Sequence, residues 1–246
     1  MELLRPFWNK LFSLNWKFGL FLIVLICLPR FGLVLQANVT GHYGAIGLIM
    51  VVSALIPFLF LTPAGRTKIG LVKPSDAKWL LFAILLGLGF SLLIHLTGKG
   101  LFGTSYENWY QYIGRSYNIP AGISTEDKRV MFIITALVSM IFSPVGEELF
   151  FRGIVHSSFR ESVGESTASR IDASAFALTH LAHFGLVYVN SQWQILWLPA
   201  LIWVSSMFIV SLVFYACRKY AGSLLGAIIC HAAFNLGMVY CIFYLL

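Results

Sequence analysis

IFSPVGEELFFRG, residues 141–153, is the stretch from which the organisation of this chain is best understood. It lies in a strongly apolar region, yet it carries two adjacent carboxylates, Glu147 and Glu148, and an arginine, Arg152. Ionisable side chains at membrane depth are rare, face the interior of a helix bundle, find partners and usually mark a working site. This stretch therefore predicts a buried polar site at the centre of the protein.

The composition identifies the environment of that site. Of the 246 residues, 59% are hydrophobic and only 11% are charged, whereas a soluble domain carries about 25% charged residues. The apolar runs are long and do not alternate with polar residues, which favours helices over a transmembrane barrel. The sequence predicts an all-α, polytopic transmembrane bundle of about seven to eight helices. We expect it to form one integral membrane domain over 1–246, with the polar motifs in 130–246.

The apolar runs place seven spans, at 18–36, 43–61, 79–96, 128–159, 171–189, 195–216 and 223–246. In the first span, Pro29-Arg30 interrupts the apolar run. This pair indicates either a kink in the helix or an arginine side chain that snorkels to one membrane face. In the fourth, Ser143-Pro144 either begins a new helix or kinks a continuous one. In the long loop 97–129, Thr104–Glu107 resembles a capping box. It predicts either a short aromatic helix lying in the membrane interface or an ordinary aromatic-rich loop.

Charge and cysteine placement exclude some classes of function. The formal net charge is +7, but the lysines and arginines cluster between apolar runs, which is typical of membrane topology rather than of nucleic-acid binding. The loop charges predict a cytoplasmic N-terminus in the cell or inner membrane, with lipids as neighbours and no nucleic-acid partner. The four cysteines have no metal-binding spacing and are interpreted as core residues.

Three elements carry polar side chains at similar predicted depth. Glu148 and Arg152 are four residues apart and therefore neighbours on one helical face. Glu147 is offset from them, has no partner within its helix, and is predicted to be the carboxylate that is free to act as a general base. His180 lies in the fifth span, and His231 and Asn235 share a face of the seventh. The other four histidines, among them His183 and His156, are expected to be structural.

Rival intramembrane chemistries lack their sequence signatures. No His-Glu-x-x-His zinc motif occurs, the aspartates lie outside the predicted spans or at their ends, and no Gly-x-Ser-Gly turn is present. A site centred on a glutamate remains.

The three elements also resemble the motifs of a known family. In order along the chain they read EExxxR at 147–152, FxxxH at 176–180 and HxxxN at 231–235. This set resembles the CPBP family, which comprises the CAAX proteases and bacteriocin-processing enzymes and is also called Abi. The resemblance covers about 130–246, and the N-terminal half is similar only in being helical and apolar.

The resemblance implies an intramembrane endopeptidase whose active cavity opens toward the cytosol. Glu147 would activate a water together with His180, and His231 and Asn235 would hold the oxyanion. Glu148 and Arg152 would support the site from behind. The implied substrate is a hydrophobic or lipid-modified peptide or protein.

The cofactor and the activity remain open at this stage. No cofactor is expected, although Glu147, His180 and His231 form a set of donors that could bind zinc and leave a position for water. Because the resemblance extends to proteins of bacteriocin self-immunity, it also implies an alternative function as a non-catalytic membrane partner or regulator. A transporter that uses Glu147 as a proton relay ranks last, because no inverted repeat is visible.

Overall fold

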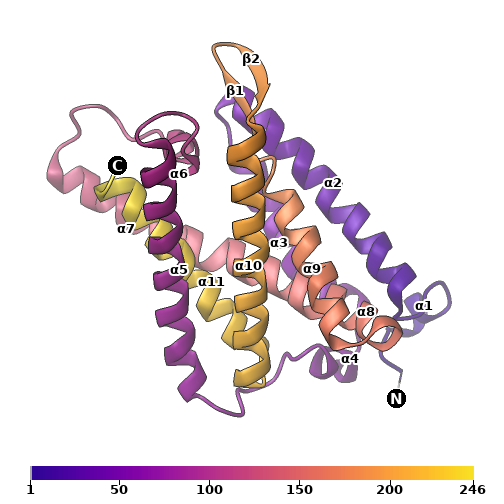
Figure 1. Ribbon diagram of the computed structural model, residues 1–246. Coiled ribbons are helices and arrows are strands. Elements are labelled where there is room, and N and C mark those ends of the chain that lie inside the picture. Colours follow the sequence, from indigo (N-terminus) through magenta and orange to yellow (C-terminus); the bar gives the residue numbers. More distant parts are fainter. Residues whose placement is uncertain (1) are drawn as a thin grey trace.

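The fold is known from a computed structural model, which describes residues 2–246, and it is a helical bundle with one small hairpin (Figure 1). The elements are α1 (Pro6–Asn9), α2 (Trp16–Thr40), α3 (Gly44–Phe60), α4 (Pro63–Lys68), α5 (Lys78–Phe102), α6 (Trp109–Gly114), η1 (Arg115–Tyr117), α7 (Thr125–Glu147), η2 (Glu148–Val155), α8 (His156–Val163), α9 (Glu165–Thr179), β1 (Leu186–Val189), β2 (Gln192–Ile195), α10 (Trp197–Ala221) and α11 (Leu224–Tyr244). The predicted all-α polytopic architecture is confirmed.

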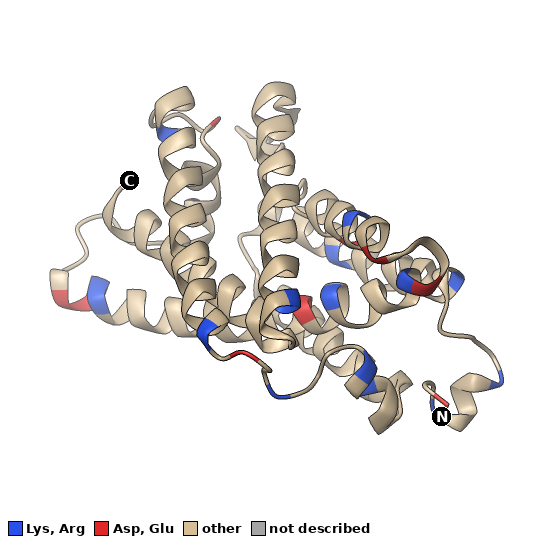
Figure 2. Ribbon diagram, turned by 60° about the horizontal axis from the view of Figure 1, so that its bottom comes forward, with Lys and Arg blue, Asp and Glu red and all other residues tan. Residues whose placement is uncertain are grey.

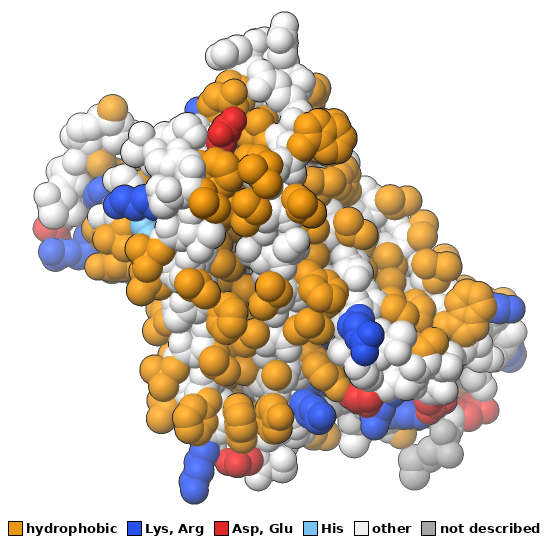
Figure 3. All heavy atoms as spheres, viewed as in Figure 1, with side chains coloured by type: hydrophobic (Ala, Val, Ile, Leu, Met, Phe, Trp, Pro, Cys, Tyr) orange, Lys and Arg blue, Asp and Glu red, His pale blue; other side chains and the backbone are white. Residues whose placement is uncertain are grey.

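Five helical segments within 2–246 are long and apolar enough to cross a membrane. They are α2, α5, the continuous segment from α7 through α8, α10 and α11, and α3 is a shorter apolar helix. Figure 2 shows α5 and α10 as long ribbons with charged residues only near their ends. Hydrophobic side chains cover the outer face of these helices in Figure 3, and charged groups gather at its margins. A lipid-facing surface has this distribution, because apolar side chains on it remain exposed to hydrocarbon rather than water.

The fourth predicted span is one continuous helix through Pro144, so no new helix begins at Ser143-Pro144. The backbone widens into a π-helical turn over η2 before it returns to α-helix at α8. Such turns are uncommon and occur frequently at functional sites. Here the turn contains Glu148 and Arg152.

The fifth predicted span is wrong in its second half. Helix α9 ends at Thr179, and the chain then turns into the antiparallel hairpin β1–β2, in which Val189 pairs with Gln192. The two intervening residues, Asn190 and Ser191, both have positive φ angles, as a two-residue hairpin turn requires. The aromatic and β-branched residues of LVYV and QWQI favour strands. The apolar residues 186–189 extended the predicted span beyond the true end of the helix at Thr179.

The helix of the long loop was predicted too early and in the wrong environment. It begins at Trp109, and Asn108, not the Thr104–Glu107 segment, caps it by accepting a hydrogen bond from the Tyr110 amide. Trp109 and Tyr110 are fully buried, and the Trp109 indole donates to the Ile94 carbonyl of α5. The helix therefore packs into the bundle instead of presenting its aromatic face to lipid. All four cysteines are free and buried, as core residues should be.

Close helix packing positions the polar segment. Helix α7 lies against α3, and a Cβ atom at Gly146 would come within 2.4 Å of the Met50 carbonyl oxygen. Only glycine allows the two backbones to approach so closely, which is typical of helix contacts in membranes. Helices α7 and α11 run obliquely behind α5 and α10 (Figure 1). This crossing places Glu147 deep inside the bundle.

Candidate functional site

Glu147 is almost completely buried and carries two partners that the sequence did not predict. The Ser143 hydroxyl donates to its Oε1 at 2.7 Å, and an Arg30 guanidinium nitrogen lies 2.9 Å from the same oxygen. The expectation that Glu147 has no partner within its helix is therefore wrong, because Ser143 lies on the same helix, and Arg30 adds a partner from α2. A carboxylate buried in an apolar medium needs a compensating charge, and α2 provides it.

The interpretation of Arg30 as a snorkelling side chain is also wrong. Its residue is only 3% exposed, and it points from α2 into the bundle. A signal for this was present in the sequence, since Arg30 is the one charged residue within the apolar run of the first span. By default such a residue has an intramembrane partner of opposite charge.

Glu148 lies behind Glu147 and connects two helices. Its Oε2 is 3.2 Å from Arg152 Nε, so the pair predicted from the four-residue spacing is in contact. Its Oε1 lies 2.7 Å from His231 Nδ1 on α11. All atoms of this carboxylate are buried. Glu148 thereby holds the His231 ring in one orientation, because a carboxylate only accepts and the ring nitrogen must donate.

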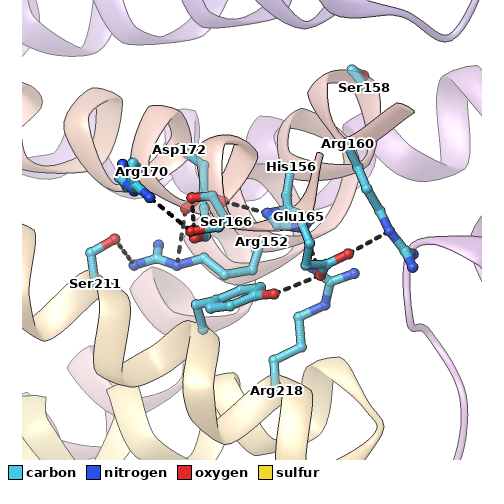
Figure 4. Close-up of polar contacts among 12 residues, drawn as sticks. Arg152, His156, Ser158, Arg160, Glu165, Ser166, Arg170, Asp172, Ser211 and Arg218 are labelled. Carbon is cyan, nitrogen blue, oxygen red and sulfur yellow. Dashed lines mark hydrogen bonds and ion pairs between the residues drawn. The ribbon is translucent and has the colours of Figure 1, made fainter. Parts of the chain in front are cut away.

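Arg152 lies in a second buried polar network, shown in Figure 4. It donates to the Ser211 hydroxyl at 2.6 Å, and its guanidinium carbon lies 4.4 Å from the centre of the Phe176 ring. Asp172 Oδ1 is 3.9 Å from Arg152 Nε, and Asp172 Oδ2 is 2.8 Å from His156 Nδ1. This network fastens η2 to α9 and α10.

The network continues to the end of the bundle that carries α8. His156 Nε2 lies 3.2 Å from a Glu165 oxygen, and the Tyr215 hydroxyl donates to that oxygen at 2.6 Å. Arg160 pairs with the other oxygen of Glu165 (Figure 4). The sequence predicts that Asp172 lies at the edge of a span and that His156 is structural. The contacts of His156 agree with a structural role.

His180 is the residue that follows the last turn of α9. Its Nδ1 lies 2.7 Å from the Phe176 carbonyl, one turn earlier in the chain. Since a carbonyl only accepts, Nδ1 carries the proton, and Nε2 of the neutral ring has a free lone pair. The Trp203 indole donates to the backbone carbonyl of His180 and fixes this segment against α10. The ring is thus oriented to accept a proton at Nε2.

The two predicted α11 residues are both engaged and mostly buried. The His231 ring stacks on Phe214 with centroids 4.5 Å apart. Asn235 uses one amide hydrogen to reach the Ser139 carbonyl of α7 at 2.9 Å. The second amide hydrogen of Asn235 has no acceptor among the described residues. It is therefore available to a ligand in the cavity.

These side chains surround one cavity. Its volume is about 680 Å³, and Glu147, His180, His231 and Asn235 all line it. Arg30 and His183 line it as well, and the remaining lining is largely apolar and comes mainly from α3, α7, α10 and α11. Glu148 and Arg152 are absent from the lining and lie behind it. A roomy apolar cavity with a few convergent polar groups is the usual form of a ligand site.

The residues do not fit the zinc arrangement considered above. Within 2–246, no three His, Cys, Asp or Glu side chains form a group that could hold a metal ion. In particular, the Arg30 guanidinium occupies Oε1 of Glu147, where a second cation would be repelled. We derive no step through a metal.

Comparison with known proteins identifies one family. Residues 129–237 match the family model described as type II CAAX prenyl endopeptidase Rce1-like. The matched segment includes all six site residues predicted from the sequence, but neither Arg30 nor any other part of α2. Neither a search of curated proteins nor a search of solved structures finds a significant match.

Proposed function

Since residues 129–237 belong to the Rce1-like family of type II CAAX prenyl endopeptidases, we propose that this integral membrane protein is an intramembrane endopeptidase. Its substrate would be a hydrophobic or lipid-modified peptide or protein at the membrane, and its cavity would open toward the cytoplasmic side. The observation that carries the proposal is the cavity itself. Four side chains from three separate helical segments line it, and they include a carboxylate, two imidazoles and a carboxamide.

In the proposed reaction a water between Glu147 and His180 attacks the scissile carbonyl carbon. Its proton passes to Glu147 or to the lone pair of His180 Nε2, and the carbonyl π electrons move to oxygen. When the intermediate collapses, the oxyanion re-forms the C=O bond, the C–N bond breaks and the leaving nitrogen takes that proton. The products are a carboxylic acid, which then ionises in water, and an amine. General bases of this kind contribute about 10²- to 10⁴-fold to the rate.

The other side chains serve the transition state. The free amide hydrogen of Asn235 is a donor for the developing oxyanion, and His231 faces the same cavity. Glu148 positions His231 through the 2.7 Å contact to Nδ1, and Arg152 holds Glu148. Donors fixed before the reaction are effective in a low-dielectric cavity because they need no reorganisation.

A purified full-length protein in lipid nanodiscs tests the proposal. The probe is a quenched fluorescent peptide that carries a farnesylated cysteine near its C-terminus, with an unmodified peptide alongside. Glu147→Gln should reduce cleavage by about 10²-fold or more, and Glu107→Gln, at an exposed loop glutamate, should not. Membrane proteomics of cells carrying wild type or Glu147→Gln would reveal natural substrates. Full turnover by Glu147→Gln would remove the proposal.

The ion pair between Arg30 and Glu147 favours one second candidate, a non-catalytic membrane partner or regulatory protein of the same family. In that case the neutralised pair would be a structural element of a binding cavity. The two functions are separated by expressing a Glu147→Ala, His180→Ala double variant in cells from which the gene for this protein has been deleted. The measurement is whether the variant rescues the deletion phenotype. Rescue by the double variant supports binding, and loss of rescue with retained protein levels supports proteolysis.

A further inference from the structure

Arg30 is the one cationic side chain among the described residues that line the cavity. It comes from α2, outside the segment that matches the family. Only 3% of the surface of Arg30 is exposed. Burying a guanidinium in a membrane bundle is costly, so a residue in this position is expected to have a function.

The hydrogen bonds of Arg30 are incomplete. A guanidinium has five N–H donors. One terminal nitrogen serves Glu147 at 2.9 Å, whereas the buried Nε has no acceptor among residues 2–246. The side chain therefore has donor capacity left over, directly beside the carboxylate that would activate water.

The other candidate donors are partly committed. His231 Nδ1 is bound to Glu148, and one Asn235 hydrogen is bound to the Ser139 carbonyl. Neither carries a fixed positive charge. Only Arg30 combines a permanent charge with a place in the cavity lining.

We propose that Arg30 is a further catalytic residue, which donates a hydrogen bond to the oxyanion of the tetrahedral intermediate. The inference rests on the proposed peptidase function and assigns one more group to the same site. In the resting site Arg30 holds the Glu147 carboxylate. As the carbonyl π electrons move to oxygen, the guanidinium interacts with that new charge, while Glu147 accepts the proton of the attacking water and becomes neutral. The net charge of the pair and the oxyanion is then the same before and after the attack.

The alternative is that Arg30 is only a counter-ion for Glu147. A counter-ion would affect ligands only through the charge of Glu147, so Arg30→Gln would then leave phosphinate binding unchanged once Glu147 is replaced by Gln. An oxyanion donor acts on ligands that carry negative charge at the position of the scissile carbonyl. Two uncleavable analogues of the probe peptide make this distinction, a phosphinate with an anionic tetrahedral centre and a neutral E-alkene isostere without a carbonyl oxygen.

The experiment measures the affinity of both analogues and the cleavage rate for full-length protein in nanodiscs. Arg30→Gln should weaken phosphinate binding and lower kcat by about 10²- to 10³-fold, as loss of one oxyanion donor does elsewhere. The affinity for the alkene should not change. Arg30→Lys should lie between wild type and Arg30→Gln, because lysine keeps the charge but not the planar fork. Arg218→Gln is the matched control, since Arg218 is buried but does not line the cavity.

A second pair of variants protects the test against misfolding. The first is Glu147→Gln, and the second combines Glu147→Gln with Arg30→Gln. The two differ only at residue 30, and the second contains no buried carboxylate without a counter-ion. Phosphinate binding should be weaker in the double variant. The inference would be overturned if these two variants bound the phosphinate equally. It would also be overturned if Arg30→Gln weakened the binding of both analogues to the same extent or increased the cleavage rate.

The outcomes also separate this inference from the proposed function. If wild type binds the phosphinate in an Arg30-dependent way but cleaves nothing, the peptidase proposal fails and the anion-binding role of Arg30 stands. If wild type cleaves the probe and Arg30→Gln cleaves it equally well, the peptidase stands and the role of Arg30 is overturned. If wild type neither cleaves the probe nor binds the phosphinate, both are overturned.

Discussion

Breaking the ion pair between Arg30 and Glu147 should reveal a large coupling energy. The two charged atoms are 2.9 Å apart, and the side chains are only 4% and 2% exposed. For charges about 4 Å apart in an effective dielectric of about 20, the attraction is about 4 kcal/mol. Removing one partner of a buried pair also strands the other charge, and measured costs are about 3–5 kcal/mol. Removing both partners is often close to neutral.

A double-mutant cycle measures this coupling. Arg30→Met alone should lower the free energy of unfolding by about 3–5 kcal/mol, whereas Arg30→Met with Glu147→Gln should lower it by about 0–2 kcal/mol. Glu147→Gln alone should also be destabilising, because it strands Arg30. The double variant should therefore be more stable than either single variant, which the sum of two destabilising effects cannot produce. Unfolding of the full-length protein in mixed micelles of a mild detergent and sodium dodecyl sulfate, followed by circular dichroism, provides the free energies.

The exposed pair of Lys68 and Glu161 is the matched control. Their side chains are 33% and 60% exposed, and pairs at the surface contribute about 0–1 kcal/mol. The cycle of Lys68→Met and Glu161→Gln should give a coupling in that range. If the coupling of the Arg30–Glu147 pair is no larger than that of the control, the buried pair is not formed in the membrane and the reasoning is refuted.

Three further predictions concern packing, the second network and pH. Gly87→Ala should destabilise the fold by about 1–3 kcal/mol, because the new Cβ would lie 2.2 Å from the Cys230 carbonyl oxygen; unchanged micelle unfolding would contradict the contact of α5 with α11. Arg152→Met should cost about 3–5 kcal/mol in the same assay by stranding Glu148, and a loss below about 1 kcal/mol would show that the pair is solvated. For Glu165, burial raises the pKa, but the Tyr215 hydrogen bond and the nearby positive charges lower it below the usual value of 4.5. The wild type should therefore lose stability relative to Glu165→Gln as the pH falls below about 4.5, and parallel pH profiles of the unfolding temperature would contradict this.

Long apolar runs made most of the helices predictable, because a spanning segment must satisfy its backbone internally and must be apolar along about 20 residues. The hairpin was not predicted because its first strand, LVYV, continues the apolar run of the fifth predicted span. Residues 186–195 pair with each other and bend at Asn190-Ser191, a local conformation that hydropathy does not describe. The aromatic and β-branched residues of LVYV and the alternation in QWQI were the available signals.

The sequence predicted which side chains would meet, whereas it did not predict the contacts that they make. The motif spacings identified Glu147, His180, His231 and Asn235, which line one cavity, but they gave no information about partners from distant helices. Arg30 is 117 residues from Glu147 in the chain, and only the packing of α2 against η2 and α8 brings it to that carboxylate. Pair contacts across a bundle depend on helix rotation and tilt, which packing sets and composition does not.

Arg30, the cation beside Glu147, lies outside the segment that matches the family. Residues 129–237 supply two adjacent carboxylates, and Arg152 from the same segment accompanies Glu148. The cation beside Glu147 comes from α2. Without α2, Glu147 would be a buried carboxylate with only the Ser143 hydroxyl as a close partner, and such a group is expected to become protonated instead of staying charged. A protonated Glu147 cannot accept a proton from water. In the proposed mechanism the N-terminal half would therefore be part of the site, because Arg30 of α2 would keep Glu147 charged.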